Sequence, residues 1–208
     1  MTVDLKGITL KSLAKNLGGT LPVEMMALFL AKMLGIFRQV HGAGYTHRDV
    51  KPHNFVLGDP LDPLDEKLYL IDFGLAKKYR DESGQHLPYA EGVKVKGTFV
   101  YMSQYTHMGI EPSRRDDLES LAYTAASLIK GRLPWSRLGH KTVKQRRKLV
   151  ELKETVSPAE IFEGFPEEFP KFLQYARGLD YYEDPDYSYW QRVFSELAER
   201  EASSKRTD

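Results

Sequence analysis

A polar segment and a short motif that follows it constrain the fold of this chain more than any other feature. His47 to Asn54 reads HRDVKPHN, and Asp72 to Gly74 reads DFG. A long buried helix is predicted before the first of these, because residues 23–40 are mostly apolar and Pro22 is tolerated in a first helical turn. A short strand is predicted over residues 68–71. The polar segment is therefore expected to be a loop between a helix and short strands.

The rest of the chain is predicted to be mainly helical. Ser113 is expected to cap a helix that runs to about Lys130 and ends at Gly131. Further helices are predicted near residues 142–153, 167–178 and 188–200. Residues 58–67 are expected to form a polar turn between two strands. Residues 74–112 should form a long irregular segment of the kind that compact domains keep for function. A disordered polar tail is expected over residues 202–208.

The composition excludes some classes of protein and site. The 208 residues contain 30 Lys and Arg against 29 Asp and Glu, so the net charge of +1 names no partner. Because there is no cysteine, disulfides, cysteine-ligated zinc and thiol catalysis are excluded. No apolar run approaches the ~18 residues of a membrane span, and the N-terminus lacks a secretion signal. A cytoplasmic or nuclear protein without a membrane partner is expected.

The polar side chains of the two motifs suit phosphoryl transfer. This reaction needs a group that orients and deprotonates the attacking hydroxyl, a role that fits Asp49. It also needs oxygen ligands that hold Mg²⁺ on the phosphates, which Asn54 and Asp72 would supply. Lys51 could neutralise charge on the transferred group, and Gly74 allows a sharp turn after the metal ligand.

Together, the order and spacing of these residues form the catalytic-loop and metal-binding signature of protein kinases. Other segments resemble the casein kinase I family more closely. They are DFGLAKKYRD at 72–81, THMGI at 106–110, SRRDDLESL at 113–121, LPW at 133–135 and PDYSY at 185–189. The family also lacks the Ala-Pro-Glu motif of most kinases, and residues 103–105 (SQY) stand in its place here. The resemblance runs from about Val3 to Phe194.

The resemblance implies a fold and an activity. The fold would be the large helical lobe of a protein kinase, mainly α, with short β-hairpins at the cleft and the small β lobe absent. This domain would cover residues 1–200, truncated at the hinge at about residues 3–7, with a tail at 201–208. The activity would be ATP- and Mg²⁺-dependent phosphorylation of protein serine or threonine, with a protein substrate or regulatory protein as partner. Asp117 would brace the catalytic loop through its backbone amides.

The resemblance also places a nucleotide site near the N-terminus. Backbone groups of Asp4 and Lys6 would meet the adenine at the hinge. Val56 and Ile71 would form the apolar floor under the ring. Ser12 stands where the family has an acid at the ribose, and its hydroxyl could still bond the sugar more weakly.

One departure from the family concerns the nucleotide-binding groups that the small lobe would supply. No Gly-rich loop, strand lysine or partner glutamate precedes the hinge, so weak nucleotide binding and little or no turnover are expected. Three alternatives stay open. The chain could be the large lobe of a casein kinase I-like kinase, present as a fragment or truncated gene product. It could instead be a catalytically dead scaffold that binds proteins, or a lobe completed by a separate polypeptide that supplies the small lobe.

Other departures concern charge. The family's basic residues that read acidic or phosphorylated substrates fall on Val100 and Gly139 here, so that preference is doubtful. His53 replaces an aspartate and is expected to be a tolerated surface change. Residues 137–150 carry six lysines and arginines and no acid, which indicates either a solvated helix face or a site for an acidic partner or nuclear import. Nucleic acid is not expected, because no aromatic residues are interleaved with the charges.

Overall fold

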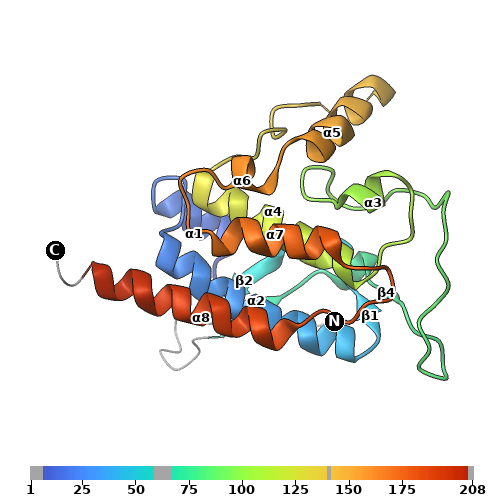
Figure 1. The fold of residues 1–208 in the computed structure, drawn as a ribbon, viewed down its shortest axis with the longest axis horizontal. Helices are drawn as coiled ribbons and strands as arrows, with labels where there is room; N and C mark the ends of the chain where they lie inside the picture. Colours follow the sequence, from blue (N-terminus) through green and yellow to red (C-terminus); the bar gives the residue numbers. More distant parts are fainter. Residues whose placement is uncertain (1–6, 59–66, 140–141, 206–208) are drawn as a thin grey trace.

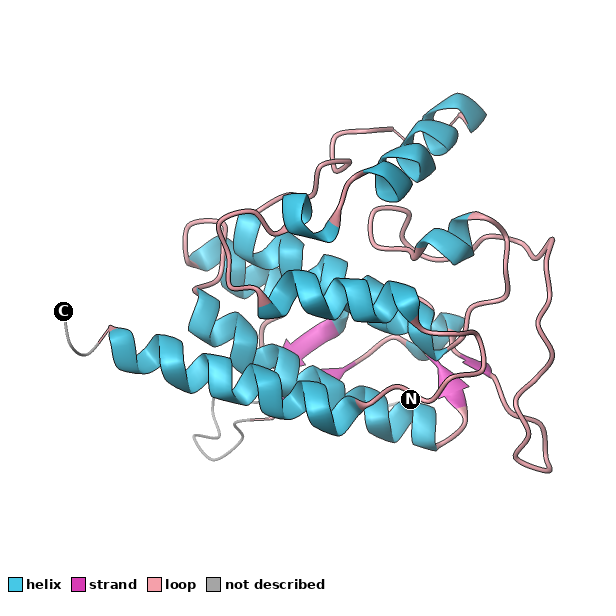
Figure 2. Ribbon diagram, in the orientation of Figure 1, coloured by secondary structure: helices cyan, strands magenta, loops and turns pink. Residues whose placement is uncertain are grey.

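The computed structural model describes residues 7–58, 67–139 and 142–205, and none of the helices in these ranges could cross a membrane. The architecture is mainly helical, as the resemblance implies (Figures 1 and 2). The described helices are α1 (Leu10–Asn16), α2 (Val23–Gly42), α3 (Gln104–His107), α4 (Arg114–Lys130), α5 (Val143–Thr155), α6 (Pro158–Ile161), α7 (Glu168–Gly178) and α8 (Tyr187–Ser204). Short 3₁₀ turns lie at Pro52–Asn54 and Phe73–Leu75.

Helix α4 forms the centre of the molecule. Its side chains from Arg114 to Ile129 are all buried, on every side of the helix. Helix α7 packs against α4, and α8 lies alongside α2 over most of its length (Figure 1). A helix that is buried all round must be covered by neighbours on every face. The position of α4 therefore determines where the surrounding elements can lie.

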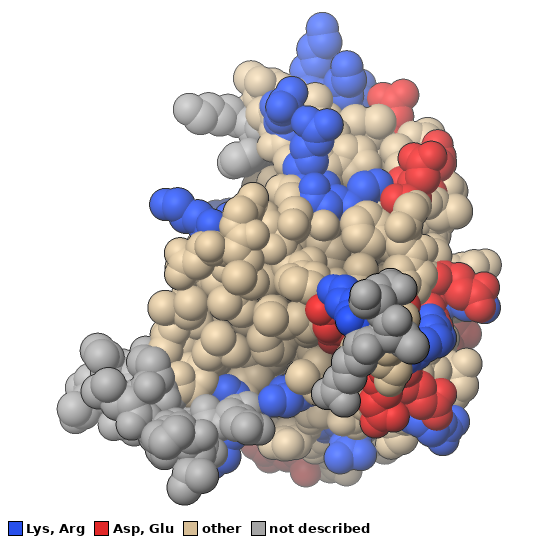
Figure 3. Space-filling view, turned by 90° about the vertical axis from the view of Figure 1, so that its left-hand side faces the viewer, with Lys and Arg blue, Asp and Glu red and all other residues tan. Residues whose placement is uncertain are grey.

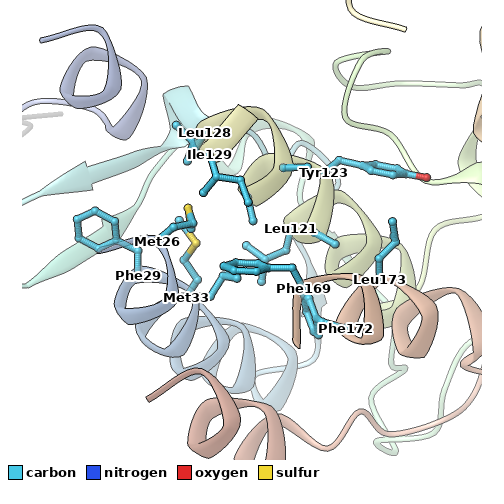
Figure 4. Packing of buried hydrophobic residues seen from close by; sticks show 14 of the residues in the cluster. Met26, Phe29, Met33, Leu121, Tyr123, Leu128, Ile129, Phe169, Phe172 and Leu173 are labelled. Carbon is cyan, nitrogen blue, oxygen red and sulfur yellow. The ribbon is translucent and has the colours of Figure 1, made fainter. Parts of the chain in front are cut away.

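The apolar core forms where α2, α4 and α7 meet. Met26 and Met33 of α2 point toward Leu121 of α4 and toward the aromatic rings of α7 (Figure 4). The ring of Phe172 in α7 lies 5.5 Å from that of Phe194 in α8. Aromatic rings bury large areas and pack well edge to face, so this contact ties α8 to the core.

Two small antiparallel sheets flank the polar segment. Strand β2 (Phe55–Leu57) pairs with β3 (Leu68–Leu70), and β1 (Tyr45–Thr46) pairs with β4 (Lys77–Lys78). The strand predicted over 68–71 is therefore confirmed, while most of the turn predicted over 58–67 lies outside the described residues. Because β1 precedes the segment 47–54 and β2 follows it, both ends of that loop are held by sheet hydrogen bonds.

The helix predicted between Ser113 and Gly131 is confirmed at both ends. Ser113 is the N-cap residue, and the Asp116 carboxylate accepts a hydrogen bond from its backbone N–H at 2.8 Å. Gly131 ends it with φ of 77°, a left-handed conformation that glycine adopts at little cost. Helices α2, α5 and α7 also begin and end close to their predicted bounds, whereas α1, α3 and α6 were not predicted.

The predicted disordered tail needs a correction. Helix α8 continues to Ser204, so residues 202–204 are helical rather than disordered. Beyond the helix, Lys205 Nζ lies 2.7 Å from a carboxylate oxygen of Glu24 in α2. This exposed ion pair lies between the end of α8 and the start of α2. Residues 206–208 lie outside the described ranges.

The packing of α7 leads to a stability prediction. Replacing Phe172 with alanine should lower the free energy of unfolding by about 3–5 kcal/mol, because it leaves a cavity between α7 and α8. Urea denaturation would measure the loss. The control is Val143→Ala on the exposed start of α5, which should cost less than about 0.5 kcal/mol. Equal losses for the two variants would contradict the described packing.

Candidate functional site

The polar loop is held by one buried carboxylate, that of Asp117 in the first turn of α4. Its Oδ1 accepts a hydrogen bond from the backbone N–H of Arg48 at 2.8 Å, and its Oδ2 accepts one from that of His47 at 2.7 Å. The Nε2 atom of His41 lies 2.9 Å from Oδ2. Arg48 has φ of 71°, which is costly for a residue with a side chain, so these bonds hold a strained conformation in place. The bracing role expected for Asp117 is confirmed.

The environment of Asp117 favours its ionised form. Burial acts to raise the pKa of this carboxyl, but the hydrogen bond from His41 and the nearby groups of His47 outweigh it, so the pKa lies below its ordinary value. The network continues from His41, whose Nδ1 lies 2.6 Å from the hydroxyl of Tyr187. Tyr79 also donates to the backbone carbonyl of His41 at 2.7 Å. Helices α2, α4 and α8 thus meet behind the loop.

Asp49 is fixed on both of its carboxylate oxygens. Oδ1 accepts hydrogen bonds from the backbone N–H and the hydroxyl of Thr98, at 2.9 and 2.7 Å. Oδ2 lies 2.5 Å from Nζ of Lys51. Burial acts to raise the pKa of Asp49, but the bonds from Lys51 and Thr98 prevail and lower it. Asp49 is therefore an oriented, ionised acceptor.

The residue before Thr98 must be a glycine for this contact to form. Gly97 has φ of 113°, and a Cβ atom there would lie 2.7 Å from the carbonyl oxygen of Arg48. Such a distance is too short for any side chain. The close approach of the segment at 97–98 to the polar loop therefore depends on glycine.

Asn54 connects the polar loop to the metal-binding motif. Its side-chain N–H donates to the backbone carbonyl of Asp49 at 2.9 Å. Its backbone carbonyl accepts a hydrogen bond from the N–H of Ile71 at 2.9 Å. Asp72 follows directly, with φ of 64° and an exposed side chain whose Oδ1 lies 3.4 Å from the N–H of Gly74. The ring of Phe73 packs edge to face on His47, with centroids 5.0 Å apart. The loop and the motif are therefore adjacent.

The donors at Asn54 and Asp72 suit Mg²⁺. The amide oxygen of Asn54 accepts no hydrogen bond within the described ranges, and the Asp72 carboxylate faces solvent. Those ranges contain no cluster of three His, Asp or Glu side chains that could hold a metal ion. A protein cage is not needed, because Mg²⁺ usually binds one or two side-chain oxygens and completes its shell with phosphate and water.

The residues expected at the nucleotide are only partly described. Asp4 and Lys6 lie outside the described ranges. The chain enters just after them beside β2, where the Gly7 N–H donates to the Leu57 carbonyl at 3.0 Å. Val56 is buried, while Ile71 is 40% exposed at the end of β3. An exposed apolar side chain here is consistent with a floor for a planar ring.

Ser12 lies on the surface at the start of α1. Its backbone N–H donates to the hydroxyl of Thr9 at 3.1 Å, and the two hydroxyls are also 3.1 Å apart. Thr9 is therefore the helix cap, and Ser12 is part of that first turn. His53 is exposed, as expected for a surface change.

The structure accounts for the two altered charge positions. The carbonyl of Val100 accepts a hydrogen bond from the indole N–H of the buried Trp135 at 2.8 Å, and the Val100 side chain packs against the core. At Gly139, the space that a side chain would need is filled by the side chain of Gln145. Gln145 is held there by a capping box with Thr142. A lysine at 139 would have to displace it.

Thr98 and Lys153 hold the segment at 98–102 in place, and neither was predicted from the sequence. Thr98 belongs to the segment and binds Asp49. Lys153 of α5 is fully buried, and its Nζ donates to the carbonyls of Phe99 at 3.0 Å and Met102 at 2.6 Å. A lysine in a basic helix looks like a solvated residue. The available signal was its position four residues after the buried Leu149, on the same helix face.

The amine of Lys153 also meets a histidine. Its Nζ lies 3.0 Å from Nε2 of His107 and 5.0 Å from the centre of the Tyr123 ring. Burial, followed by the charge of Lys153, lowers the pKa of His107 to about 3, so His107 is neutral near pH 7. Burial lowers the pKa of Lys153 as well. The irregular segment at Phe99 and Met102 is thus held by the buried polar cluster of Lys153 and His107.

The Asp117 network leads to a prediction. Asp117→Asn should lower the free energy of unfolding by about 3 kcal/mol, because a neutral amide satisfies the two loop N–H groups poorly and leaves His41 without its anion. Urea denaturation would measure this loss, and hydrogen exchange should show the amides of His47 and Arg48 opening faster. Glu201→Gln, on the surface of α8, is the charge-matched control. Unchanged exchange at both amides would contradict the bracing role.

His107 gives a prediction of pH dependence. Because its folded pKa is lowered to about 3, the unfolded chain takes up a proton below about pH 6.5 that the folded chain excludes. Its stability contribution is therefore fully present above that pH and is lost as the pH falls toward about 3. Relative to His107→Gln, the wild-type chain should lose about 2–3 kcal/mol between about pH 7.5 and 4.5 by urea denaturation. A constant difference would refute a neutral buried His107.

Comparison with known proteins agrees with this geometry. The model of the protein kinase domain matches residues 5–181. Casein kinase I homolog 2 of Schizosaccharomyces pombe is 39% identical over 199 residues, which cover 95% of this chain and 46% of that protein. Casein kinase I homolog 1 of the same yeast is 40% identical over 202 residues, covering 96% and 45%. The chain thus spans about half the length of these curated relatives. It belongs to the casein kinase I family of protein kinases.

Proposed function

We propose that this chain carries the phosphoryl-transfer machinery of a serine/threonine kinase and that alone it turns over slowly. The observation that carries the proposal is the fixed carboxylate of Asp49, with Thr98 on one oxygen and Lys51 on the other. A structural loop would not need an acidic group oriented in this way beside two candidate Mg²⁺ ligands. The retention of Asn54 and Asp72 at that position favours catalysis over binding alone.

Asp49 would act mainly by orienting the hydroxyl of the protein substrate. Its lowered pKa makes it a weak base in the ground state. A weak base suffices where the transition state is loose, because the hydroxyl proton becomes acidic only as the bond to phosphorus forms. Lys51, which already contacts Asp49 and lies 3.4 Å from the Thr98 hydroxyl, is placed to meet negative charge on the transferred group.

Asn54 and Asp72 would hold Mg²⁺ on ATP. When bound, the ion supplies positive charge that neutralises the phosphate oxygens. The chain's own contribution is to keep both oxygen donors in place. Asn54 is held through its bonds to the Asp49 carbonyl and the Ile71 N–H. Asp72 is held through its left-handed backbone and its contact with the Gly74 N–H.

Slow turnover is proposed because these 208 residues offer few groups that could hold the triphosphate on the side that faces away from Asn54 and Asp72. Positioning supplies most of the rate of phosphoryl transfer, so a nucleotide held on one side only should react poorly. The cleft is also open on this side, since Ile71 is 40% exposed and Phe73 is 48% exposed.

A second candidate is a lobe that binds a protein cover, either as a scaffold or to complete the site. Two adjoining hollows of about 510 and 480 Å³ run along α2 and share Gln39 and Phe73. The second is lined mostly by apolar side chains, including Val40 and Tyr45. An exposed apolar groove of this kind favours contact with another polypeptide. A small lobe supplied separately would cover it.

The test is phosphate transfer from Mg-ATP to casein. The wild-type chain should transfer phosphate slowly, and Asp49→Asn should reduce the rate by about 100-fold or more. Mg-ATP should raise the melting temperature of the wild type but not that of Asp72→Asn. Both variants would first be checked by circular dichroism. Adding a separately expressed small lobe from a yeast relative should raise the rate if the site is completed in this way.

The outcomes separate the two candidates. If Asp49→Asn left the rate of transfer unchanged, the activity would come from another enzyme in the preparation. That result would contradict the kinase proposal. No transfer and no Mg-ATP-dependent melting shift, with or without an added small lobe, would favour the scaffold. A small lobe that binds without restoring transfer would also point to a binding role.

A further inference from the structure

Four tyrosines from three separate parts of the sequence meet on one surface of the chain. They line a hollow of about 680 Å³, here called the tyrosine hollow: Tyr89, Tyr105, Tyr181 and Tyr182. Tyr105 belongs to α3, and the last two follow α7. Tyr182 is 54% exposed and Tyr89 is 41% exposed. Single exposed apolar side chains are common on proteins, but exposed rings that adjoin one another indicate a binding surface.

The rings of the tyrosine hollow are held in place by contacts within the chain. The ring of Tyr181 packs edge to face against those of Tyr89 and Tyr182, with centroids 5.2 and 5.0 Å apart. The hydroxyl of Tyr182 accepts a hydrogen bond from the backbone N–H of Tyr89 at 2.9 Å. The guanidinium of Arg115 lies 3.6 Å from the centre of the Tyr105 ring. Side chains that are already ordered lose little entropy when a ligand binds.

Packing of the fold explains only part of this surface. Tyr181 is buried, and its ring also meets that of His86 at 4.9 Å, so it forms the base of the cluster. Residue 182 is tied to α4 by its backbone carbonyl, which accepts a hydrogen bond from Arg114 at 2.6 Å. Any residue could accept that bond. The exposed tyrosine ring at 182 is therefore not required by the contact that positions it.

Acidic side chains border the tyrosine hollow. The seven residues from 180 to 186 contain four acids and no cation. Two of these acids have a structural role, because Asp184 pairs with an arginine of α4 and Asp186 caps α8. The other two, Asp180 and Glu183, line the hollow and are exposed. Neither carboxylate forms an ion pair with another residue in the described part of the chain.

The cations of the chain do not cancel this negative charge. Figure 3 shows Lys and Arg side chains gathered at the top of one face, the end of the molecule that carries α5 in Figure 1. Arg115 also lines the hollow, but its Nη1 donates to the carbonyl of Leu179 at 3.2 Å and its Nε lies 3.8 Å from the Asp116 carboxylate. The unpaired charge at the hollow is therefore negative, and it favours a ligand with a cationic group.

We propose that the tyrosine hollow is a docking site for a proline-rich segment of a partner protein that also carries a lysine or arginine. Proline rings pack on aromatic side chains, and a polyproline II segment is already extended before it binds, so it loses little entropy. The hydroxyls of Tyr105 and Tyr181 form no hydrogen bond with another described residue and can donate to the carbonyls of the segment. The basic side chain would meet Asp180 and Glu183.

Other ligands fit the tyrosine hollow less well. A phosphorylated peptide or a nucleic acid would be repelled by Asp180 and Glu183, although its rings or bases could stack on the tyrosines. A single methylated ammonium group would suit aromatic rings and acids but would fill only a small part of about 680 Å³. A basic proline-rich segment uses both the aromatic surface and the charge.

The tyrosine hollow is connected to the catalytic loop through Glu111. The N–H of Glu111 donates to the carbonyl of Ala90, next to Tyr89, at 2.9 Å. The carboxylate of Glu111 lies 3.4 Å from the guanidinium of Arg48 in the loop. A docked partner would therefore be held by the segment that adjoins the loop. Docking uses none of the nucleotide-binding groups, so it can be tested separately from catalysis.

The experiment measures binding of a labelled peptide to the full chain by fluorescence anisotropy, without nucleotide. The probe has the sequence APPLPPLPRA. One matched peptide has alanine in place of every proline, and a second has glutamate in place of the arginine. The wild-type chain should bind the probe at least about 10-fold more tightly than either matched peptide, because the first loses the preformed shape and the second loses the charge contact.

The aromatic contact is tested with one matched pair of variants. Tyr182→Ala should weaken binding of the probe by about 10-fold or more, because tyrosines often supply much of the free energy of binding at a contact surface. Tyr189→Ala is the control, since Tyr189 is 45% exposed and lies on α8 outside the hollow. It should weaken binding by less than about twofold.

The charge contact is tested with a second pair. Asp180→Asn with Glu183→Gln should weaken binding of the probe by about threefold or more and should reduce its dependence on salt. Glu163→Gln with Glu199→Gln removes the same charge from exposed positions outside the hollow. This control should change the affinity by less than about twofold.

Several results would overturn the docking proposal. Equal affinity for the probe and the alanine peptide would exclude recognition of proline, and equal losses for Tyr182→Ala and Tyr189→Ala would exclude the hollow as the site. Tighter binding of a trimethyl-lysine peptide without proline would indicate an aromatic cage for methylated ammonium. If Tyr182→Ala fails to fold, NMR can follow the backbone amides of the wild-type chain during titration with the probe. Shifts in none of the signals from residues 89–91 and 179–183 would then refute the site.

Discussion

The carboxylate of Asp117 is the contact on which the candidate site depends. A buried charge costs several kcal/mol unless donors surround it. Here the N–H groups of His47 and Arg48 and the ring of His41 approach the same two oxygens. The start of α4 adds a favourable dipole for an acid in its first turn. The loop therefore takes its strained shape because that shape is what satisfies the buried charge.

A second buried charge does the same for the irregular segment. Residues 98–102 have no strand partner. The N–H groups of Tyr101 and Met102 bind the Thr98 carbonyl within the turn, while other polar groups of the segment bind side chains. Thr98 finds Asp49, while the carbonyls of Phe99 and Met102 find the amine of Lys153. Asp49 from the loop and Lys153 from α5 thus hold the same five residues. This accounts for an ordered path without regular secondary structure.

Local chemistry explains what the sequence could predict. The helix from Ser113 to Gly131 was predicted at both ends because caps depend on neighbouring residues alone. The candidate Mg²⁺ ligands Asn54 and Asp72 and the candidate base Asp49 were proposed from a short motif. Lys153 was missed because its burial depends on Trp135 and Tyr123, which are distant in sequence. The helical turn at 202–204 was missed because Ser203 and Ser204 are polar and exposed, so no apolar pattern marks them as part of α8.

Ion pairs fix the cations that surround the catalytic loop. Close to the catalytic loop, cations already have carboxylate partners. Lys51 meets Asp49 at 2.5 Å, while Arg48 and Lys77 both meet Glu111, at 3.4 and 2.9 Å. An anion that arrives there must compete with an existing carboxylate partner. The groups that orient Asp49 are therefore in place before any ligand arrives.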